Sequence, residues 1–301
     1  MTRTGDSAIR RLGRRPVAMA ATVVVALFAG SATLLTAHDF WLVPDAFAVT
    51  PGGRIELSGQ TSSLFPSSLS AVAPDRIISA QVVTANSAVT VRDVSVQGQS
   101  LRLAHAATTA GQHLIGVQLA PRTVRESPAS FRRYLDLEGA PEARQRYERA
   151  GLLPPVGGDS IVRRYAKYAK TVVEVGDGPR AFQRPLDHPL EFVLLSDPSA
   201  LRIGDTLRVR LVLLGKPAVS ASLHAGSVPS GPGARTDTAA ARRDAARDVK
   251  LETDASGVAT VVVTQSGLWN IRTLQIVPAD KGSGADWDVH WATLVFSVKR
   301  R

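Results

Sequence analysis

The sequence contains no cysteine in 301 residues. Disulfide frameworks, thiol catalysis and cysteine-ligated zinc are therefore excluded as sources of stability or chemistry. Lysine is scarce as well, because it supplies only six of the 36 basic residues, and aromatic residues make up 5% of the chain. The net charge of +10 is spread along the sequence and is not interleaved with aromatic residues. We therefore expect no binding of nucleic acid.

Familiar catalytic signatures are also missing. The sequence has no Gly-x-Ser-x-Gly elbow, no His-Glu-x-x-His motif, no phosphate-binding loop and no dinucleotide-binding fingerprint. The run Asp254-Ala255-Ser256-Gly257 lacks the ligand spacing of a calcium loop and is better explained as a hairpin turn. We therefore expect a protein that is not an enzyme, with an exported hydrolase as the least favoured alternative.

The first 37 residues have the composition of an export signal. Arginines at positions 10, 11, 14 and 15 precede the apolar run Val17–Ala29, and Leu35-Thr36-Ala37 offers a cleavage site before His38. We predict a signal peptide over residues 1–37 and a periplasmic or extracellular protein. The alternative is an uncleaved anchor, since the segment from position 17 to 35 approaches the ~20 residues of a membrane span. No later stretch is apolar enough to cross a membrane.

Two parts of the sequence resemble each other in the same order. Three pairs of similar segments occur: Phe40–Gly52 and Phe192–Gly204, Ala110–Ile115 and Ser266–Ile271, and Tyr168–Val175 and Trp291–Val298. The members of these pairs are 152, 156 and 123 residues apart, respectively. The drop from 156 to 123 means that the first copy carries 33 extra residues between its last two matched segments. In Leu207–Leu213, apolar residues at every second position alternate with Arg208, Arg210 and Val212, which is typical of an antiparallel strand.

We therefore predict an all-β protein with two tandem immunoglobulin-like or transthyretin-like antiparallel β-sandwich domains, the first with a short helical insertion. Phe131, Tyr134 and Leu135 would share one helical face within that insertion. The Pro-rich segment before Leu190 has no periodicity and is expected to be a linker. The predicted boundaries are 38–180 for the first domain, 127–158 for its insertion, 181–189 for the linker and 190–301 for the second domain.

Six segments of the chain resemble, in order, a bacterial family of exported proteins: AHDFWLVP, YAKTVVEVG, HPLEFVLLSDPSALRIGDTLRVRLVLLGKP, TDASGVATVVV, SGLWNIR and DWDVHWATLVFSV. The family has no known function and is often labelled as a nickel-uptake transporter substrate-specific component. The resemblance covers nearly all of residues 38–301. It implies a periplasmic or cell-surface location, β-sandwich domains and, through the label, a part in metal uptake, but it brings no agreed catalytic residues.

Cleavage after Ala37 would make His38 the first residue of the mature protein. Its α-amine and imidazole can together chelate a transition metal, and imidazole nitrogen suits copper, nickel and zinc. In this feature the chain is similar to exported copper-binding β-sandwiches whose metal sits on an N-terminal histidine. The alternative is that His38 only marks the cleavage site, because Phe40 and Trp41 beside it have the character of core residues.

Further candidate metal ligands occur near the end of the chain and at the linker. Asp286, Asp288 and His290 alternate with apolar residues and would share one face of a strand. The alternative is a solvated polar face opposite an apolar one. His188 and Glu191 lie where the linker enters the second domain, and domain junctions often hold small-molecule sites. A solvated linker is the alternative here.

The leading hypothesis is an exported, non-enzymatic binding protein that handles a divalent transition metal (nickel, cobalt or copper) or assists a membrane metal transporter. Its metal ligands would come from His38, His188, Asp286, Asp288 and His290. The alternative is a cell-envelope module that binds protein or glycan without metal. Its contacts would come from loops such as Ser62–Pro74 or Ser227–Asp244. In either case, contact with a membrane is expected only through the N-terminal segment, if that segment is not cleaved.

Overall fold

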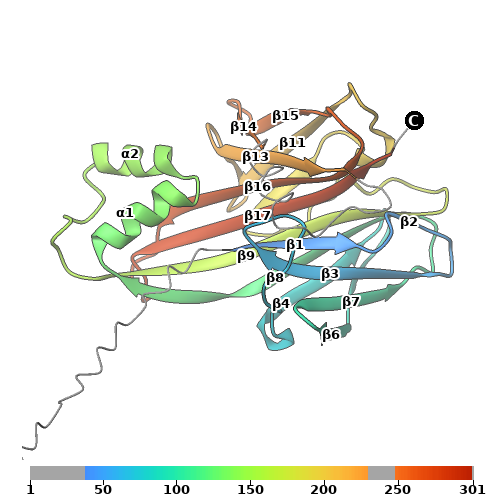
Figure 1. The fold of residues 1–301 in the computed structure, drawn as a ribbon, viewed down its shortest axis with the longest axis horizontal. Helices are drawn as coiled ribbons and strands as arrows, with labels where there is room; N and C mark the ends of the chain where they lie inside the picture. The colour runs from blue at the N-terminus through green and yellow to red at the C-terminus, as the bar shows by residue number, and fades with distance from the viewer. Residues whose placement is uncertain (1–37, 230–247, 300–301) are drawn as a thin grey trace, which may run out of the picture. The chain divides into compact units, whose positions relative to one another are not determined.

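The computed structural model describes residues 38–229 and 248–299, and most of these residues lie in β-strands (Figure 1). The strands of the first half are β1 (Asp39–Pro44), β2 (Ala48–Val49), β3 (Arg54–Ser62), β4 (Ile77–Val83), β5 (Ala88–Thr90), β6 (Asp93–Gln97), β7 (Ser100–Ala106), β8 (Gly111–Glu126) and β9 (Ile161–Val175). Two helices, α1 (Pro128–Leu137) and α2 (Pro141–Arg149), lie between β8 and β9.

The second half contains eight described strands, which follow a linker. They are β10 (Leu190–Leu194), β11 (Thr206–Leu213), β12 (Lys216–Pro217), β13 (Ser222–Val228), β14 (Val249–Glu252), β15 (Val258–Val262), β16 (Gly267–Pro278) and β17 (Trp287–Val298). Single turns of 3-10 helix occur at Pro74–Arg76 and Pro198–Ala200. No helix of the described chain has the length and apolar character needed to span a membrane.

The strands form three sheets. The central sheet has nine strands in the order β14-β13-β16-β17-β9-β8-β4-β5, with β2 paired to β9. The first small sheet has the order β1-β3-β7-β6, and in the second small sheet β10, β12 and β15 all pair with β11. Both β17 and β2 run parallel to β9, and every other pairing in the described residues is antiparallel. The central sheet is therefore continuous between the two halves of the chain.

The two small sheets pack on opposite faces of the central sheet. Ile115 and Val173 belong to the core beneath the first small sheet, together with Phe40 of β1. Their sequence neighbours Leu114 and Val172 belong to the core beneath the second small sheet. Successive side chains of a strand point to opposite faces. The strands β8 and β9 are consequently buried on both sides.

The strand pairing confirms the internal repeat. In the central sheet, Gly111 pairs with Val175 and Gly267 pairs with Val298. These four residues are the ones that the offsets of 156 and 123 relate to each other. The register of β8 with β9 is thus repeated by β16 with β17, and the 33 additional residues lie in the longer strands β8 and β9 and in the connection between them.

The small sheets repeat in the same way. Ile55 of β3 pairs with His105 of β7, and Leu207 of β11 pairs with Val261 of β15. Apart from β2, β6 and β12, the strands of the two halves therefore match, although the small sheets cover opposite faces. A two-fold rotation about an axis along β9 and β17 produces this arrangement, because it preserves strand direction and exchanges the two faces of the sheet.

The helical insertion covers part of the second half. Ser127 is the N-terminal cap of α1, because its Oγ accepts a hydrogen bond from the Ser130 N–H at 3.2 Å. Phe131 and Tyr134 of α1 pack in one cluster with Trp287 and Trp291 of β17, and Figure 1 shows both helices beside the start of β9. The tryptophan side chains are therefore buried by residues that have no counterpart in the second repeat.

The structure confirms the all-β immunoglobulin-like class and the short helical insertion. The boundaries 38–180 and 190–301 remain predictions, since the central sheet continues across them from β9 to β17. The predicted loop Ser227–Asp244 needs a correction, because its first two residues belong to β13. Its residues 230–244 lie outside the described part of the chain, as does the predicted signal segment 1–37.

Candidate functional site

The predicted metal ligands near β17 are engaged in other contacts. Asp288 accepts two hydrogen bonds from the Arg164 guanidinium, at 2.6 and 2.8 Å. Asp286 lies just before β17, where its Oδ2 accepts a main-chain N–H of β9 at 2.6 Å. His290 is 9% exposed, and its Nδ1 lies 3.1 Å from the Tyr168 hydroxyl. All three side chains are therefore held by β9.

His188 lies beside the same tyrosine. Its ring centroid is 5.6 Å from that of Tyr168, and the His290 ring is 6.0 Å from it at an interplanar angle of 18°. Burial, and secondly the charge of Lys170, lower the pKa of His188 to about 4. Its Nε2 has no hydrogen-bond partner among the described residues. The junction thus places two predicted ligands, His188 and His290, against the same Tyr168 ring.

Lys170 and Glu191 form a buried ion pair at this junction. Their exposed fractions are 2% and 4%. The Lys170 ammonium donates to the Glu191 carboxylate and to the Phe192 carbonyl, the latter at 2.8 Å. The carboxylate also accepts the Leu186 N–H at 2.8 Å. The end of the linker is therefore buried against β9 and β10. The alternative of a solvated linker is wrong at Glu191.

His38 lies at the start of β1, among charged groups. Lys167 donates to its carbonyl oxygen, and burial followed by the charge of Lys167 lowers the pKa of the His38 ring. Asp39 is buried, and its Oδ1 has no hydrogen-bond partner in the described chain. Burial raises the pKa of Asp39 to about 6 and lowers that of Lys167 to about 8. The start of β1 is thus polar and largely desolvated.

The five predicted ligands are not assembled at one place. They lie at the start of β1, at the end of the linker and around the start of β17. Within residues 38–229 and 248–299, no group of three or more histidine, aspartate or glutamate side chains is placed to hold a metal ion. Binding through the His38 α-amine depends on cleavage after Ala37, outside the described residues. The metal role therefore stays a prediction.

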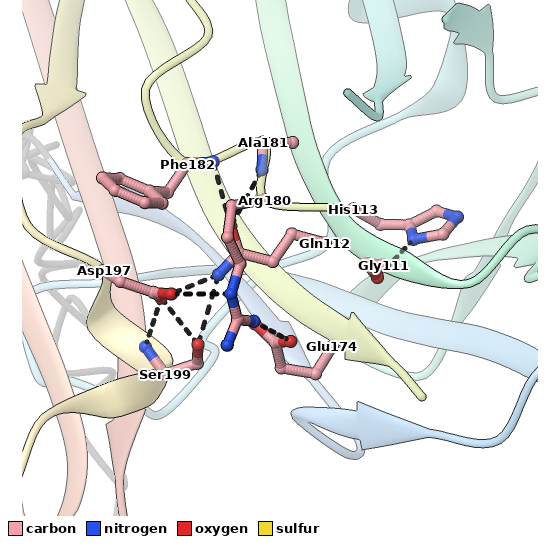
Figure 2. Close-up of polar contacts among 9 residues, drawn as sticks. All are labelled: Gly111, Gln112, His113, Glu174, Arg180, Ala181, Phe182, Asp197 and Ser199. Atoms are coloured by element: carbon pink, nitrogen blue, oxygen red, sulfur yellow. Dashed lines mark hydrogen bonds and ion pairs between the residues drawn. The ribbon is translucent and has the colours of Figure 1, made fainter. Parts of the chain in front are cut away.

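A polar network around Gln112 fixes the linker to both halves (Figure 2). The Gln112 side chain is fully buried and accepts hydrogen bonds from two main-chain N–H groups of the linker, each at 3.0 Å. Its Nε2 donates to Asp197 at 2.7 Å. Arg180 pairs with Glu174 at 2.5 Å and with Asp197 at 3.2 Å. No sequence motif marks this glutamine, and its contacts make it a structural joint.

Within residues 38–229 and 248–299, the second small sheet ends at a strand with no partner on its outer side. β15 pairs with β11 on one side only, and the Val263 N–H that follows β15 donates to the Asp205 carbonyl at 2.9 Å. The main-chain groups of alternate residues point to opposite sides of a strand. Thr260 and Val262 consequently point their N–H and C=O groups away from β11. In the described chain, no hydrogen bond reaches these groups.

A groove runs beside this free edge, between the two sheets of the second half. Its volume is about 220 Å³, and Ala225, Leu251 and Trp269 contribute to its lining. Val249 and Val262, which also line it, are 54% and 56% exposed. Natural proteins usually protect sheet edges, because an edge is a template for another strand. Unpaired backbone beside an apolar groove is the arrangement with which some domains bind extended peptides.

The first half of the chain covers the corresponding edge itself. β7, the counterpart of β15, is paired on its outer side by β6. Residues 91–99 between β5 and β7 contain β6, whereas only residues 253–257 separate β14 from β15. No expectation from the sequence pointed to the open edge of β15. The shorter connection in the second repeat was the signal that could have revealed it.

Another groove, of about 500 Å³, lies between the helical insertion and the turn that joins β16 to β17. Leu152, Pro154 and Trp287 contribute to its lining. The backbone of the turn is paired, since the Ala279 N–H donates to the Asp286 carbonyl at 3.0 Å. The open edge of β15 is therefore the stronger candidate, because it combines a groove with unpaired main chain.

Among known families, one matches most of the chain. The family model described as "Domain of unknown function (DUF4198)" matches residues 35–276. No curated protein matches the sequence.

The likeness to solved structures is weak. Trypsin-activated alpha-2-macroglobulin from Escherichia coli is 12% identical, with a TM-score of 0.23, over 88% of this chain and 16% of that one. The Yersinia pseudotuberculosis adhesin InvE is 14% identical, with a TM-score of 0.21, over 87% and 61%. The ectodomain (Ig1-Ig3) of mouse nectin-like molecule 4 is 11% identical, with a TM-score of 0.18, over 87% and 64%. The chain spans less than two thirds of each protein, and these likenesses carry no argument about function.

Proposed function

The chain belongs to the family described as "Domain of unknown function (DUF4198)", which names no activity, and we propose from its geometry that it is an exported, non-enzymatic binding module for an extended polypeptide segment. The segment would lie along β15. One observation supports this proposal above others. The main-chain groups of Thr260 and Val262 are unpaired in the described chain and lie beside a groove lined partly by Trp269.

Two kinds of interaction would hold the segment. Main-chain hydrogen bonds to Thr260 and Val262 would extend the second small sheet by one strand, and each bond contributes about 1 kcal/mol net. Alternate side chains would enter the groove beside Trp269, and full burial of one aliphatic side chain contributes about 1.5–3 kcal/mol. The backbone pairing would supply affinity, and the groove would select the side chains.

The proposal follows the alternative drawn from the sequence, in which the protein binds a partner without metal. The binding element differs from the loops expected there. Phe65 of the loop Ser62–Pro74 packs edge-on against Trp41, with ring centroids 5.3 Å apart, so part of this loop serves the core. The edge of β15, in contrast, has main-chain groups that are unpaired in the described chain, and an exposed Val262.

Amide NMR spectra of residues 38–301 with a synthetic octapeptide of alternating valine and serine test the proposal. The largest shifts are expected at Thr260 and Val262. Thr260→Pro should abolish them, because proline removes the N–H that points to the free edge without removing a bond to β11. Thr260→Val keeps that N–H and is the matched control. Shifts elsewhere, or equal shifts in the proline variant, would contradict the proposal.

Metal binding at His38 is a second candidate, favoured by the neighbouring Asp39. This buried aspartate keeps one carboxylate oxygen without a hydrogen-bond partner in the described chain. Cleavage after Ala37 would give His38 two nitrogen ligands for Cu(II), Ni(II) or Co(II). Titration with Cu(II) should show binding by a chain that begins at His38. It should show none by His38→Ala or by a chain with one extra residue before His38. Equal affinity in all three would remove this candidate.

A further inference from the structure

We infer that the strand bound along β15 runs antiparallel to it, turns aliphatic side chains toward the groove and carries acidic side chains on its outer face. This inference rests on the proposed function and adds the chemical character of the partner. Its basis is the internal repeat, because β6 already occupies the corresponding place in the first half of the chain.

β7 and β15 are equivalent strands. Ile55 pairs with His105 of β7, and the residues 152 and 156 positions later, Leu207 and Val261 of β15, pair in the same way. β6 then pairs antiparallel along the outer side of β7. The outer side of β15 is the side to which Thr260 points its unpaired backbone. A strand bound there would complete the second small sheet on the plan of the first.

β6 shows which side chains suit this place. Val94 is partly buried and packs against the core of the first half, whereas Asp93, Ser95, Gln97 and also Val96 are exposed. Side chains alternate between the two faces of a strand. Every second residue of a strand beside β15 would therefore face the groove that Trp269 helps to line. The groove has an apolar wall, so aliphatic residues fit these positions.

Charge on the outer face favours acidic residues at the other positions. In the first half, Asp93 of β6 forms an ion pair with Arg54 of β3, across β7. In the second half, Arg208 and Arg210 of β11 are exposed and form no ion pair within the described residues. Arg208 lies directly opposite Thr260 in the sheet. An acidic side chain beyond Thr260 would face Arg208 directly across β15. In the first half, Asp93 lies opposite Glu56 and reaches Arg54 diagonally across β7.

A second copy of the chain is the competing occupant, and charge argues against it. β15 itself, Val258–Val262, contains no acidic residue. Pairing of two β15 strands would therefore bring two arginine-bearing faces together without a carboxylate from either strand. β6 has the favoured side chains, but it is already paired to β7. The acidic, aliphatic strand is consequently expected from a different protein.

The test uses residues 38–301 and two fluorescein-labelled octapeptides. Both have valine at every second position. The other positions are all aspartate in one peptide and all lysine in the other. Fluorescence anisotropy at low ionic strength measures binding. The aspartate peptide should bind about tenfold more tightly, as two exposed charge pairs would produce. Arg208→Glu should remove the preference, because the new carboxylate offsets the remaining charge of Arg210. Arg133→Glu, the same charge change on α1, should leave it intact, and Thr260→Pro should abolish binding of both peptides.

The outcomes separate this inference from the proposed function. If neither peptide binds, or if both bind a folded Thr260→Pro variant unchanged, the proposed function fails as well. If both bind equally and Arg208→Glu has no effect, β15 binds strands but the acidic partner is wrong. A dimer of the protein alone that Thr260→Pro converts to a monomer would show that a second copy is the occupant, which overturns the inference. Arg208→Glu changes an exposed side chain, so its result does not depend on how the proline variant folds.

Discussion

The ion pair of Lys170 and Glu191 is more deeply buried than any other charge pair in the described residues. Burial lowers the pKa of Lys170, and the charge of Glu191 opposes this shift. Both partners also bond to main chain, so the pair holds β9, β10 and the linker together. A pair of this kind stabilises weakly as a whole, but the loss of one partner leaves the other charge desolvated and uncompensated.

Lys170→Met should therefore be strongly destabilising. Removal of one partner from a buried pair costs about 3–5 kcal/mol, and urea unfolding of residues 38–301 at neutral pH measures the free energy of unfolding. Arg54→Met is the matched control, because Arg54 and its partner Asp93 are 54% and 58% exposed. The control should cost about 1 kcal/mol or less. Equal losses in both variants would show that burial of Glu191 is not what makes Lys170 necessary.

At the scale of whole elements, the sequence predicted the strand at Leu207–Leu213 and the helical insertion because these depend on local pattern. Periodicity located the helix around Phe131, and the repeat located the insertion. The prediction from alternating polar residues was wrong where these residues lie on a face of the sheet that other elements cover. His290 was assigned to a candidate metal-binding or solvated face, yet it is buried against Tyr168. Local periodicity assumes that one face of a strand is solvated, whereas β9 and β17 are covered on both faces.

Pairing between distant strands was the other feature that could not be predicted. Nothing in Ile161–Val175 or Trp287–Val298 specifies that these two segments run parallel and side by side. The open edge of β15 follows from the same kind of information, since an edge is defined by the absence of a partner in the sheet. The candidate site was therefore hidden from composition and motif. Only the comparison of the two repeats, with their unequal connections before β7 and β15, pointed to it.

The segment between β13 and β14 can be shortened if the fold depends on the paired strands alone. Deletion of residues 231–246 should leave a cooperative thermal transition, because loop length contributes only weakly to closure entropy. The deletion spares Asp248, whose carboxylate pairs with Arg272, and Ser227, whose Oγ accepts from Gln265 at 2.7 Å. Thermal unfolding followed by circular dichroism is the measurement. A broad transition, or loss of the transition, would show that the deleted residues contribute to the second half.

At the scale of the whole molecule, the second half does not enclose its own core. Trp287 and Trp291 of the second half pack against Phe131 of the insertion, and Tyr168 of the first half belongs to the core beneath the second small sheet. We therefore expect residues 190–301 alone to give poorly dispersed amide NMR spectra, whereas residues 38–301 give dispersed ones. A cooperative melt and a dispersed spectrum for the isolated half would show that the predicted domain boundary is also a folding boundary.

The histidines give the whole molecule a common response to acid. All six have pKa values lowered from 6.5, with burial as the largest cause: His38, His105, His113, His188, His224 and His290. Below about pH 6.5 the unfolded chain therefore binds more protons than the folded chain, and the free energy of unfolding falls as the pH falls. Asp39 acts in the opposite direction, because its pKa is raised to about 6. Its contribution is complete below the unfolded pKa of 3.8 and is lost as the pH rises through 6.

His188 should account for the largest part of this response, because its pKa is lowered to about 4. A shift of this size corresponds to about 3 kcal/mol, present above the unfolded pKa and lost as the pH falls from about 6.5 to 4. His188→Phe keeps an aromatic ring beside Tyr168 and should flatten the dependence of urea unfolding on pH. His105→Asn removes a less buried imidazole and should change the slope less. A wild-type stability that stays level or rises between about pH 6.5 and 4.5 would contradict the expectation, because burial of neutral imidazoles requires the folded chain to resist protonation.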